Sequence, residues 1–363
     1  MKRKLAVIGA SGLIGQSCIA HFAAQPDTEV IGVSRRAPFH LHGAQFVATD
    51  LRDPKSVAAA ADALKGVTHL VYAALYEAPS LVAGWSDQEQ IRVNAEMLRN
   101  LMEIGITDHA ALAHVTLLQG TKAYGVHIRP MVLPARENRS EMREHPNFYW
   151  EQQDYLTELA GMHGWHFTVL RPQFVFGHSL GAPMNLIPAL GVYAAILKAR
   201  GEPLHYPGGP MGILEAVDAD LIAEAIDWSH GAETARNAVF NITNGDIFLW
   251  KNIWPALARS LGMEPGEDRA MELATAMPAA ASEWDAIRER HGLAAPDIGK
   301  FVGSSFQYAD FALGYGRTVA WEDSIVSTVK LRRAGFSGAI DTEEMFDKWF
   351  SRLRADRLLP PID

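Results

Sequence analysis

A glycine-rich segment near the N-terminus has the residue types and spacing of a phosphate-binding turn. Residues 9–15 read Gly-Ala-Ser-Gly-Leu-Ile-Gly and follow the apolar run 5–8. In such a turn Gly9 permits a tight bend, Gly12 lets a pyrophosphate approach the backbone, and Gly15 lets the next helix pack closely. Ordinary turns also contain glycine, so the position after the first strand carries the interpretation. The expected dinucleotide contacts here are Gly9, Ser11, Gly12, Leu13, Ile14 and Gly15.

Cationic and hydroxyl side chains end the next predicted strand. An NAD-binding chain usually has an acid there for the ribose hydroxyls, whereas this chain has Ser34, Arg35 and Arg36. Guanidinium groups suit a 2′-phosphate, so we expect NADPH or NADP as the cofactor. The alternative is that one or both arginines are solvated loop charges. Asp50 and Leu51 follow the third predicted strand, where they either meet the adenine edge or, for Asp50, cap the next helix.

A tyrosine and a lysine form the candidate acid–base pair. In a short-chain dehydrogenase the lysine stands four positions after the tyrosine, where it lowers the pKa of the phenol and holds the nicotinamide ribose. The residue four positions after Tyr149 is Gln153, and no lysine occurs between Lys122 and Lys198. Lys122 lies just past a predicted strand, at the edge of the sheet where a cofactor binds. It can therefore reach the same space from a different element.

Short apolar runs alternate with longer helical patterns through the first half of the chain. The predicted strands are 5–8, 29–33, 45–48, 68–72, 112–117 and 166–170, and the helices between them are 13–24, 54–64, 87–104 and 150–163. Strand–helix–strand repetition requires right-handed parallel crossovers, and apolar strands indicate helices on both faces. The sequence therefore predicts an α/β fold with a doubly wound parallel sheet, of the Rossmann type. Its ligands would bind at the carboxyl ends of the strands.

Beyond residue 177 the alternation gives way to loops rich in proline and glycine and to further helices. The expected helices are 184–199, 219–229, 250–261 and 343–353. We expect a dinucleotide-binding domain over residues 1–177, to which residues 213–245 return. Residues 178–212 and 246–363 would form a smaller, mainly helical substrate-binding cap.

Three segments carry more specific motifs. Residues 118–124 read Leu-Gln-Gly-Thr-Lys-Ala-Tyr, residues 147–154 read Asn-Phe-Tyr-Trp-Glu-Gln-Gln-Asp, and residues 240–246 read Phe-Asn-Ile-Thr-Asn-Gly-Asp. With these segments the chain resembles the progesterone 5β-reductase/iridoid synthase-like family of extended, atypical short-chain dehydrogenases/reductases. The resemblance covers nearly the whole chain. It implies NADPH-dependent reduction of the carbon–carbon double bond of a small hydrophobic enone or enal.

The resemblance implies that Tyr149 is the proton donor or oxyanion partner and that Lys122 is its electrostatic support. A phenol hydrogen bond aimed at the carbonyl oxygen would stabilise the enolate that forms when hydride reaches the β-carbon. Beyond the glycine turn, the expected cofactor contacts are Ser34, Arg35, Arg36, Asp50, Leu51, Ala73, Ala74, Gln119, Lys122, Tyr149, Pro172, Phe174, Val175 and Met184. The candidate substrate contacts are Tyr76, Trp85, Tyr149, Trp150, Met184 and Asn185.

The chain departs from the family pattern at several places. The family has Gly-Pro-Phe after the lysine motif, whereas residues 125–128 read Gly-Val-His-Ile, which leaves the shape of the substrate open. Gln153 stands where the family has Glu, and Trp150 replaces a second tyrosine. Gly120 and Thr121 reverse the usual order, which bears on the dihedral angles of the loop because glycine tolerates conformations that threonine does not.

Composition excludes several other classes of protein. The formal net charge of −9, without a basic stripe, argues against nucleic acid as a partner. No apolar stretch is long enough to span a membrane, so we expect a cytoplasmic protein. The single cysteine and the scattered histidines predict no metal site. From the habit of the family, a monomer or a homodimer is expected.

Two other kinds of function stay open beside the enone reductase. One is different chemistry on the same scaffold, a carbonyl reductase or an NAD-dependent sugar-nucleotide epimerase/dehydratase. The epimerase is disfavoured because Arg35 and Arg36 do not suggest tightly held NAD. The other is a non-catalytic NADP-sensing regulator, against which the retention of both Lys122 and Tyr149 argues.

Overall fold

The computed structural model describes residues 3–77 and 87–362. The chain forms two compact units, each built from segments that are distant in the sequence. The first unit comprises Met1–Gln173, Ala219–Thr243 and Val326–Gly338, and the second comprises Phe174–Asp218, Asn244–Ile325 and Ala339–Asp363. The segment Val326–Gly338 belongs to the first unit, although its sequence predicted a place in the cap. It contains the short helix α13 (Val329–Ala334), which packs on the edge strand of the sheet.

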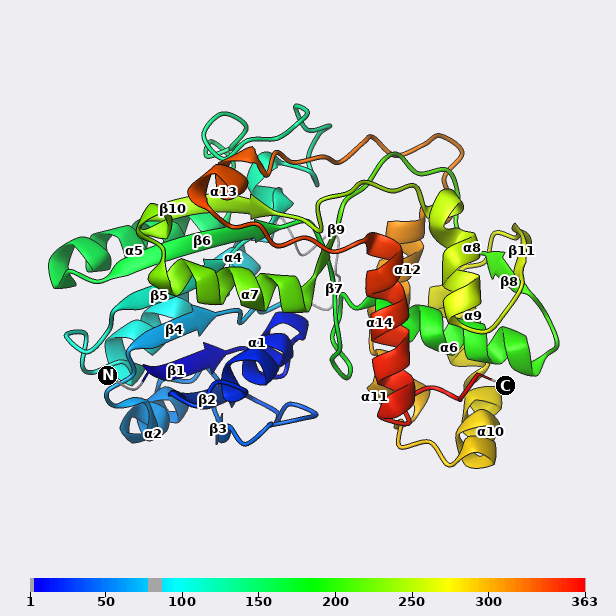
Figure 1. Ribbon diagram of the computed structural model, residues 1–363, viewed down its shortest axis with the longest axis horizontal. Helices are drawn as coiled ribbons and strands as arrows, with labels where there is room; N and C mark the ends of the chain where they lie inside the picture. Colours follow the sequence, from blue (N-terminus) through cyan, green and yellow to red (C-terminus); the bar gives the residue numbers. More distant parts are fainter. Residues whose placement is uncertain (1–2, 78–86, 363) are drawn as a thin grey trace. The chain divides into compact units, whose positions relative to one another are not determined.

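A seven-stranded parallel sheet forms the centre of the first unit (Figure 1). Its strands are β1 (Arg3–Ile8), β2 (Thr28–Ser34), β3 (Gln45–Ala48), β4 (His69–Tyr72), β5 (His114–Leu118), β6 (His166–Pro172) and β10 (Ala238–Ile242). Their order is β10-β6-β5-β4-β1-β2-β3, and every neighbouring pair is parallel. The order changes direction between β1 and β4, which is where sheets of this kind bind ligands. The predicted doubly wound fold is confirmed.

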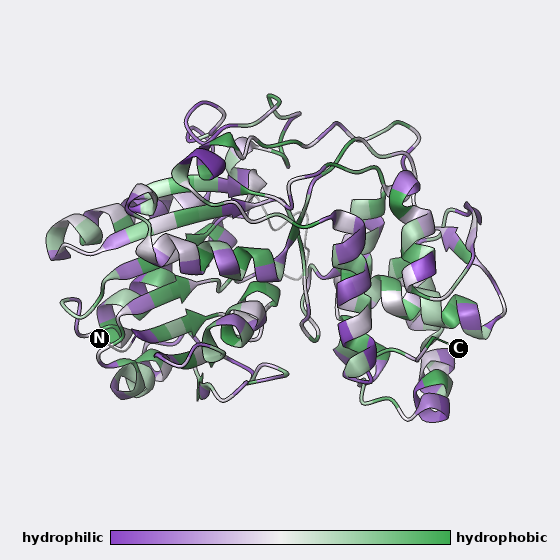
Figure 2. Cartoon of the chain, viewed as in Figure 1, coloured by the Kyte–Doolittle hydropathy of each residue, from purple (hydrophilic) through white to green (hydrophobic). Residues whose placement is uncertain are grey.

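Helices cover both faces of this sheet. They are α1 (Leu13–Ala23), α2 (Pro54–Leu64), α4 (Gln88–Asn100), α5 (Phe148–His163) and α7 (Ala219–Gly231). Helices α1 and α7 pack together on one face, and α4 packs beside α5 on the other (Figure 1). Apolar side chains of α2, α4 and α5, among them Val57, Leu98 and Leu156, are fully buried in the same core as those of the central strands. Figure 2 shows the corresponding hydrophobic colour along the strands.

Two helices differ from their predicted bounds for local reasons. Helix α5 begins at Phe148 rather than at 150, because the Asn147 side chain caps it by accepting a hydrogen bond from the Tyr149 N–H at 3.1 Å. Helix α4 ends at Asn100, and the chain continues as a π-helical turn over Leu101–Gly105. The remaining bounds of the first unit lie within two residues of those predicted.

The second unit is mainly helical. Its helices are α6 (Leu186–Ala199), α8 (Trp250–Ser260), α9 (Leu273–Ala279), α10 (Ala281–His291), α11 (Ile298–Val302), α12 (Ser305–Leu313) and α14 (Thr342–Ala355). Two small parallel sheets pair β7 (Phe174–Phe176) with β9 (Ala216–Asp218) and β8 (Leu204–Tyr206) with β11 (Pro265–Asp268). Helix α6 is buried almost all round, as its continuous apolar sequence requires. Among the helices of the described residues, none has the length and apolar character needed to cross a bilayer.

Candidate active site

The glycine turn between β1 and α1 has the geometry of a dinucleotide cradle. Gly9 has φ of +88°, and a Cβ there would lie 2.6 Å from the carbonyl oxygen of Ala73. A Cβ at Gly15 would lie 2.2 Å from the carbonyl oxygen of Gly9. No side chain caps the start of α1, and its first turn carries no acid. Because backbone N–H groups at a helix start attract anions, these residues are suited to hold a pyrophosphate.

The predicted cofactor residues at the end of β4 lie against this turn. Ala73 donates its N–H to the carbonyl oxygen of Ile8 at 2.9 Å, which continues the pairing of β4 with β1 beyond the strand. Ala74 N would be 2.8 Å from a Cβ at Gly9. The predicted contacts Gly9, Ala73 and Ala74 are therefore brought together at one edge of the sheet.

The arginines after β2 are solvent-exposed, and a third arginine, Arg52, which no sequence motif indicated, lies after β3. Asp50 and Arg52 form a bidentate ion pair after β3, in which Arg52 Nε donates to Asp50 Oδ1 at 3.0 Å and Arg52 Nη2 donates to Asp50 Oδ2 at 2.6 Å. The hydrogen bond from Arg52 lowers the pKa of Asp50, and the charge of Arg35 adds to this effect. The side chain that caps α2 is Asp53, so the capping role considered for Asp50 is wrong, and its contact with the adenine edge stays a prediction. The Ser34 hydroxyl donates to the carbonyl oxygen of Arg36 at 2.6 Å and so fixes the start of this loop.

Tyr149 lies in the first turn of α5, with its hydroxyl beside the loop that follows β5. The residue is 8% exposed. A Cβ added at Gly120 would lie 3.2 Å from the Tyr149 Oη. The backbone of Gly120 is extended, with φ of −173°, a conformation open to any residue. The reversed Gly-Thr order therefore serves close approach to the phenol and not an unusual dihedral angle.

Lys122 lies on a short 3-10 helix, Thr121–Tyr124, directly after this glycine. Its Nζ is 3.6 Å from Oε1 of Glu77, which follows β4. Burial lowers the pKa of Lys122 to about 8, although the carboxylate of Glu77 acts in the opposite direction. Burial raises the pKa of Tyr149 well above its usual value, and the charge of Glu77 raises it further. Glu77 thus acts electrostatically on both members of the candidate pair.

A buried polar network holds the backbone of Tyr149. Gln119 donates from Nε2 to the Tyr149 carbonyl oxygen at 3.0 Å and accepts at Oε1 from Arg171 Nε at 2.8 Å. Arg171 is fully buried and donates to Glu141 at 2.6 Å and to Gln153 at 3.3 Å. Both ends of the Gln119 amide are therefore engaged inside the protein, and any contact with a cofactor stays a prediction. Gln153 stands beside Arg171, where the family has a carboxylate.

The predicted substrate residues of the first unit do not form one cluster. The Tyr76 ring packs against Arg52, with 5.6 Å between the guanidinium carbon and the ring centroid. Trp150 is buried, donates from Nε1 to the His145 carbonyl oxygen at 3.2 Å, and has Arg143 and Arg171 against its ring. Trp85 lies outside the described residues. Tyr149 and Trp150 share one buried cluster with Ala123 and Tyr124, which follow Gly120, whereas Tyr76 packs against the core of the central strands.

The other predicted site residues are divided between the units. Pro172, at the end of β6, joins the first group, since its carbonyl oxygen would be 3.6 Å from a Cβ at Gly120. Phe174, Val175, Met184 and Asn185 belong to the second unit. There the ring of Phe174 lies tilted against that of Tyr308, with ring centroids 6.2 Å apart. Asn185 is fully buried, caps α6 through Ile187 N at 3.3 Å and donates to Ser179 O at 3.2 Å, so its side chain has a structural role.

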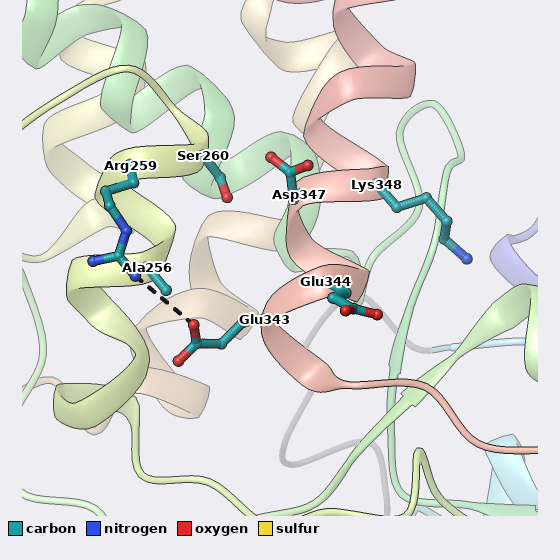
Figure 3. A pocket seen from close by; sticks show the side chains of 7 residues that line it. All are labelled: Ala256, Arg259, Ser260, Glu343, Glu344, Asp347 and Lys348. Carbon is teal, nitrogen blue, oxygen red and sulfur yellow. Dashed lines mark ion pairs between the residues drawn. The ribbon is translucent and has the colours of Figure 1, made fainter.

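A shallow pocket lies on the second unit between α8 and α14 (Figure 3). Its lining residues are Ala256, Arg259, Ser260, Glu343, Glu344, Asp347 and Lys348. Arg259 and Glu343 form an ion pair of 3.8 Å across it. The lining is mostly charged and contains none of the predicted site residues, so the pocket gives no sign of an apolar substrate. Within the described residues, no group of histidine, cysteine or acidic side chains is placed to hold a metal ion.

Comparison with solved structures supports the fold. The crystal structure of UDP-glucose 4-epimerase from Thermotoga maritima, determined with UDP-glucose, matches with a TM-score of 0.66 at 17% identity, covering 97% of this chain and 99% of that one. The UDP-glucose 4-epimerase of Thermus thermophilus, in complex with NAD, matches with a TM-score of 0.62 at 17% identity, covering 97% and 99% of the two chains. At these identities the likeness shows the fold alone.

Comparison with sequences is more specific. A model of the NAD dependent epimerase/dehydratase family matches residues 5–243. The (S)-8-oxocitronellyl enol synthase of Camptotheca acuminata is 31% identical, and the 3-oxo-Delta(4,5)-steroid 5-beta-reductase of Arabidopsis thaliana is 30% identical. Each match covers 98% of this chain and 92% of the relative. The chain belongs to the NAD dependent epimerase/dehydratase family, which is nicotinamide-dependent, and within it to the progesterone 5β-reductase/iridoid synthase-like oxidoreductases.

Proposed function

We propose that the protein is an NADPH-dependent ene reductase that adds hydrogen across the carbon–carbon double bond of a small hydrophobic enone or enal. The observation that carries the proposal is the buried phenol of Tyr149, whose hydroxyl lies beside Gly120, with Lys122 supplied by the same loop. Burial raises the pKa of this phenol and so favours its neutral form. A neutral phenol is a hydrogen-bond donor, which is what a developing enolate oxygen needs.

The names of the relatives support this reaction class. A 3-oxo-Δ4,5-steroid is an enone, and reduction at its carbon 5 adds hydrogen to the β-carbon. An enol synthase is named for an enol, and an enol forms when the enolate produced by such a hydride addition takes up a proton on oxygen. Identity of about 30% supports the class of reaction, and the substrate of this chain is part of the proposal.

The residues of the first unit have separate tasks in the proposed mechanism. When bound, NADPH supplies the hydride. The glycine turn and the start of α1 would hold the pyrophosphate of the cofactor, and Arg35, Arg36 and Arg52 would supply positive charge to its 2′-phosphate. The Tyr149 hydroxyl donates a hydrogen bond to the substrate carbonyl oxygen and stabilises the negative charge that gathers there. A solvent proton then reaches the α-carbon, so that hydride and proton together saturate the double bond.

The preference for NADPH rests on the charges at the ends of β2 and β3. An acid that would repel a 2′-phosphate is absent from the end of β2, and the Asp50 carboxylate is neutralised by Arg52. The two exposed arginines Arg35 and Arg36 are available to a ligand in solution. A phosphate ester would therefore enter a site of net positive charge.

The test follows NADPH absorbance with the purified protein and 2-cyclohexen-1-one, progesterone and a linear enal, each beside its saturated analogue and with NADH for comparison. The proposal expects oxidation of NADPH with enones or the enal, no oxidation with the saturated compounds, and weaker activity with NADH. Turnover of saturated ketones alone would make the protein a carbonyl reductase. Tight NADPH binding with no turnover of any compound would make it a cofactor-sensing protein.

A further inference from the structure

Glu77 is a buried carboxylate that the sequence motifs do not single out. Its side chain is 6% exposed. Oε2 accepts a hydrogen bond from Gln90 Nε2 at 3.0 Å, whereas Oε1 has no hydrogen-bond partner among the described residues and faces Lys122 Nζ at 3.6 Å. Burial of a carboxylate costs free energy, which the facing lysine offsets only in part while Oε1 has no hydrogen bond, so such a pair points to a functional role.

The position of Glu77 is fixed by a built set of polar contacts. Asn94 of α4 accepts from Tyr76 N and donates to Tyr76 O, both at 2.8 Å, which locks the segment directly before Glu77. Gln152 of α5 donates to the Asn94 carbonyl oxygen at 2.9 Å. The side chains of Gln90, Asn94 and Gln152 are all buried. The helix that carries Tyr149 is therefore tied to the helix that holds Glu77.

We propose that Glu77 is a positioning residue of the active site, whose carboxylate holds Lys122 as an ammonium ion and keeps the Tyr149 phenol in its neutral, donating form. The assignment of Tyr149 and Lys122 as the catalytic pair rests on the proposed function. The role of Glu77 goes beyond the proposed function, because it assigns a different state to each member of the pair. The charge of Lys122 is compensated by Glu77 within the site, and the Tyr149 phenol acts as a hydrogen-bond donor and not as a base.

The charges around the pair agree with this division. Lys122 is faced by Glu77, from the segment after β4, and by His127, from the loop beyond its own 3-10 helix. Tyr149 is faced by Glu77, which raises the pKa of the phenol, and by Arg171 of β6, which lowers it. The pKa of His127 is lowered to about 4 by burial and by Lys122, so His127 is neutral near pH 7. Glu77 is thus the acid that sustains the charge on Lys122.

The experiment compares the wild type with Glu77→Gln, Glu77→Asp and a matched control, Glu96→Gln, which removes an exposed acid of α4 that pairs with Arg92. Two readouts are taken on the full chain. The first is the titration of Lys122 by NMR of protein labelled with [ε-13C]lysine, in which the Lys122 signal is the one missing from Lys122→Met. The second is the pH profile of kcat/KM for NADPH-dependent reduction of the best enone.

Glu77→Gln is expected to lower the titration midpoint of Lys122, near pH 8 in the wild type, by one unit or more, because it removes an opposite charge within contact distance. The alkaline limb of the kcat/KM profile should move by the same amount. Glu77→Asp should largely restore both values, and Glu96→Gln should change neither. Circular dichroism and NADPH affinity report whether each variant is folded.

A Lys122 midpoint that stays unchanged in folded Glu77→Gln would overturn the proposal, and so would an equal loss of activity at every pH with no movement of the alkaline limb. If Glu77→Gln fails to fold, the titrations of Glu77→Asp and of the wild type still decide. The pairing requires that a folded Glu77→Asp variant keep a Lys122 midpoint close to the wild-type value, and a midpoint that moves by one unit or more contradicts it. Absence of enone turnover in the wild type would refute the proposed function, while the NMR midpoints would still test Glu77.

Discussion

The fully buried guanidinium of Arg171 donates from Nε to Gln119 Oε1 at 2.8 Å, and the same amide holds the Tyr149 carbonyl oxygen from its other end. One cation therefore fixes both the loop that carries Lys122 and the helix that carries Tyr149. Removing one partner of such a buried charge network leaves the others uncompensated.

We expect Arg171→Met to lower the free energy of unfolding by about 3–5 kcal/mol, because Glu141 and Gln119 lose their donor. Urea denaturation at pH 7 measures the change. Arg92→Met is the matched control, since its ion pairs with Glu89 and Glu96 are exposed and should contribute no more than about 1 kcal/mol. Equal effects of the two substitutions would show that the buried network is not a special source of stability.

Tyr149→Phe removes one hydroxyl and leaves the ring in place. Enone reduction should fall by roughly 100- to 1000-fold, the usual effect of losing an oxyanion donor, while NADPH affinity stays nearly unchanged. Stopped-flow rates and fluorescence titration of NADPH measure the two quantities. Tyr155→Phe, on the same helix with a hydroxyl bonded to Glu103, is the control and should keep the rate. Unchanged turnover in Tyr149→Phe would refute the assigned role.

Two glycine-to-alanine substitutions should act in opposite directions. Gly15→Ala places a methyl group 2.2 Å from the Gly9 carbonyl oxygen, so it should weaken NADPH binding and lower the thermal midpoint. Gly161→Ala lies on an exposed part of α5 with nothing within 4 Å of the new Cβ, and should stabilise the protein by about 0.5–1 kcal/mol. Calorimetry with and without NADPH measures both. Normal NADPH affinity in Gly15→Ala would contradict the close-packed turn.

Arg36→Ala should reduce affinity for NADPH by roughly 10- to 100-fold and leave NADH affinity unaltered, because a charge-assisted hydrogen bond to phosphate contributes about 1.5–3 kcal/mol. Isothermal titration with both cofactors gives the comparison. Arg129→Ala, at an exposed position of the loop after β5, controls for the general loss of positive charge. An equal fall for NADPH and NADH would remove Arg36 from the 2′-phosphate site.

A cluster of three histidines should make the fold sensitive to acid. His230 lies 4.6 Å from His69 and 5.3 Å from His114, measured between ring centroids. Burial lowers the pKa of His69 to about 4 and of His114 to about 3, and it lowers the pKa of His230 well below its usual value. The unfolded chain then binds more protons than the folded chain between about pH 4 and pH 6.5. Stability is complete above pH 6.5 and is lost as the pH falls toward 4.

The measurement is the urea midpoint at pH 7.5 and at pH 5.0. We expect a lower midpoint at pH 5.0 and a smaller difference in His230→Phe, whose new ring can stack on Phe22 as the imidazole does, at a centroid distance of 5.6 Å. His40→Phe, at an exposed position, should keep the full difference. A His230→Phe variant with the same pH dependence as the wild type would assign the acid sensitivity to other groups.

Local patterns predicted most of the first unit. Strand β3 and helix α2 have the predicted bounds. For α2 the reason is local, because Asp53 and Pro54 mark a helix start whatever the rest of the chain does. The glycine turn could also be predicted from local sequence, because the spacing of its glycines indicates that backbone segments pack closely there. Strand β10 was foreseen only as part of a returning segment, because its pairing with β6 joins distant parts of the sequence.

The charge partners of the candidate site could not be predicted in the same way. Glu77 reaches Lys122 only because β4 and β5 are neighbours in register, so that the segments after them meet at one edge. The burial of Arg171 and its hydrogen bond to Gln119 likewise depend on tertiary packing. The ion pair of Arg52 could have been predicted from one local feature. Arg52 stands two residues after Asp50, where its guanidinium group can turn back onto the carboxylate.

The discontinuity of the first unit bears on how the protein is made. Strand β10 and helix α13 belong to the same unit as β6 but leave the ribosome only after long stretches of the second unit have been synthesised. The β6 edge of the sheet stays unpaired during that interval, and exposed strand edges favour association with other chains. Truncation after residue 173 would leave this edge permanently open, so the dinucleotide-binding unit is not separable by cutting the gene at one place.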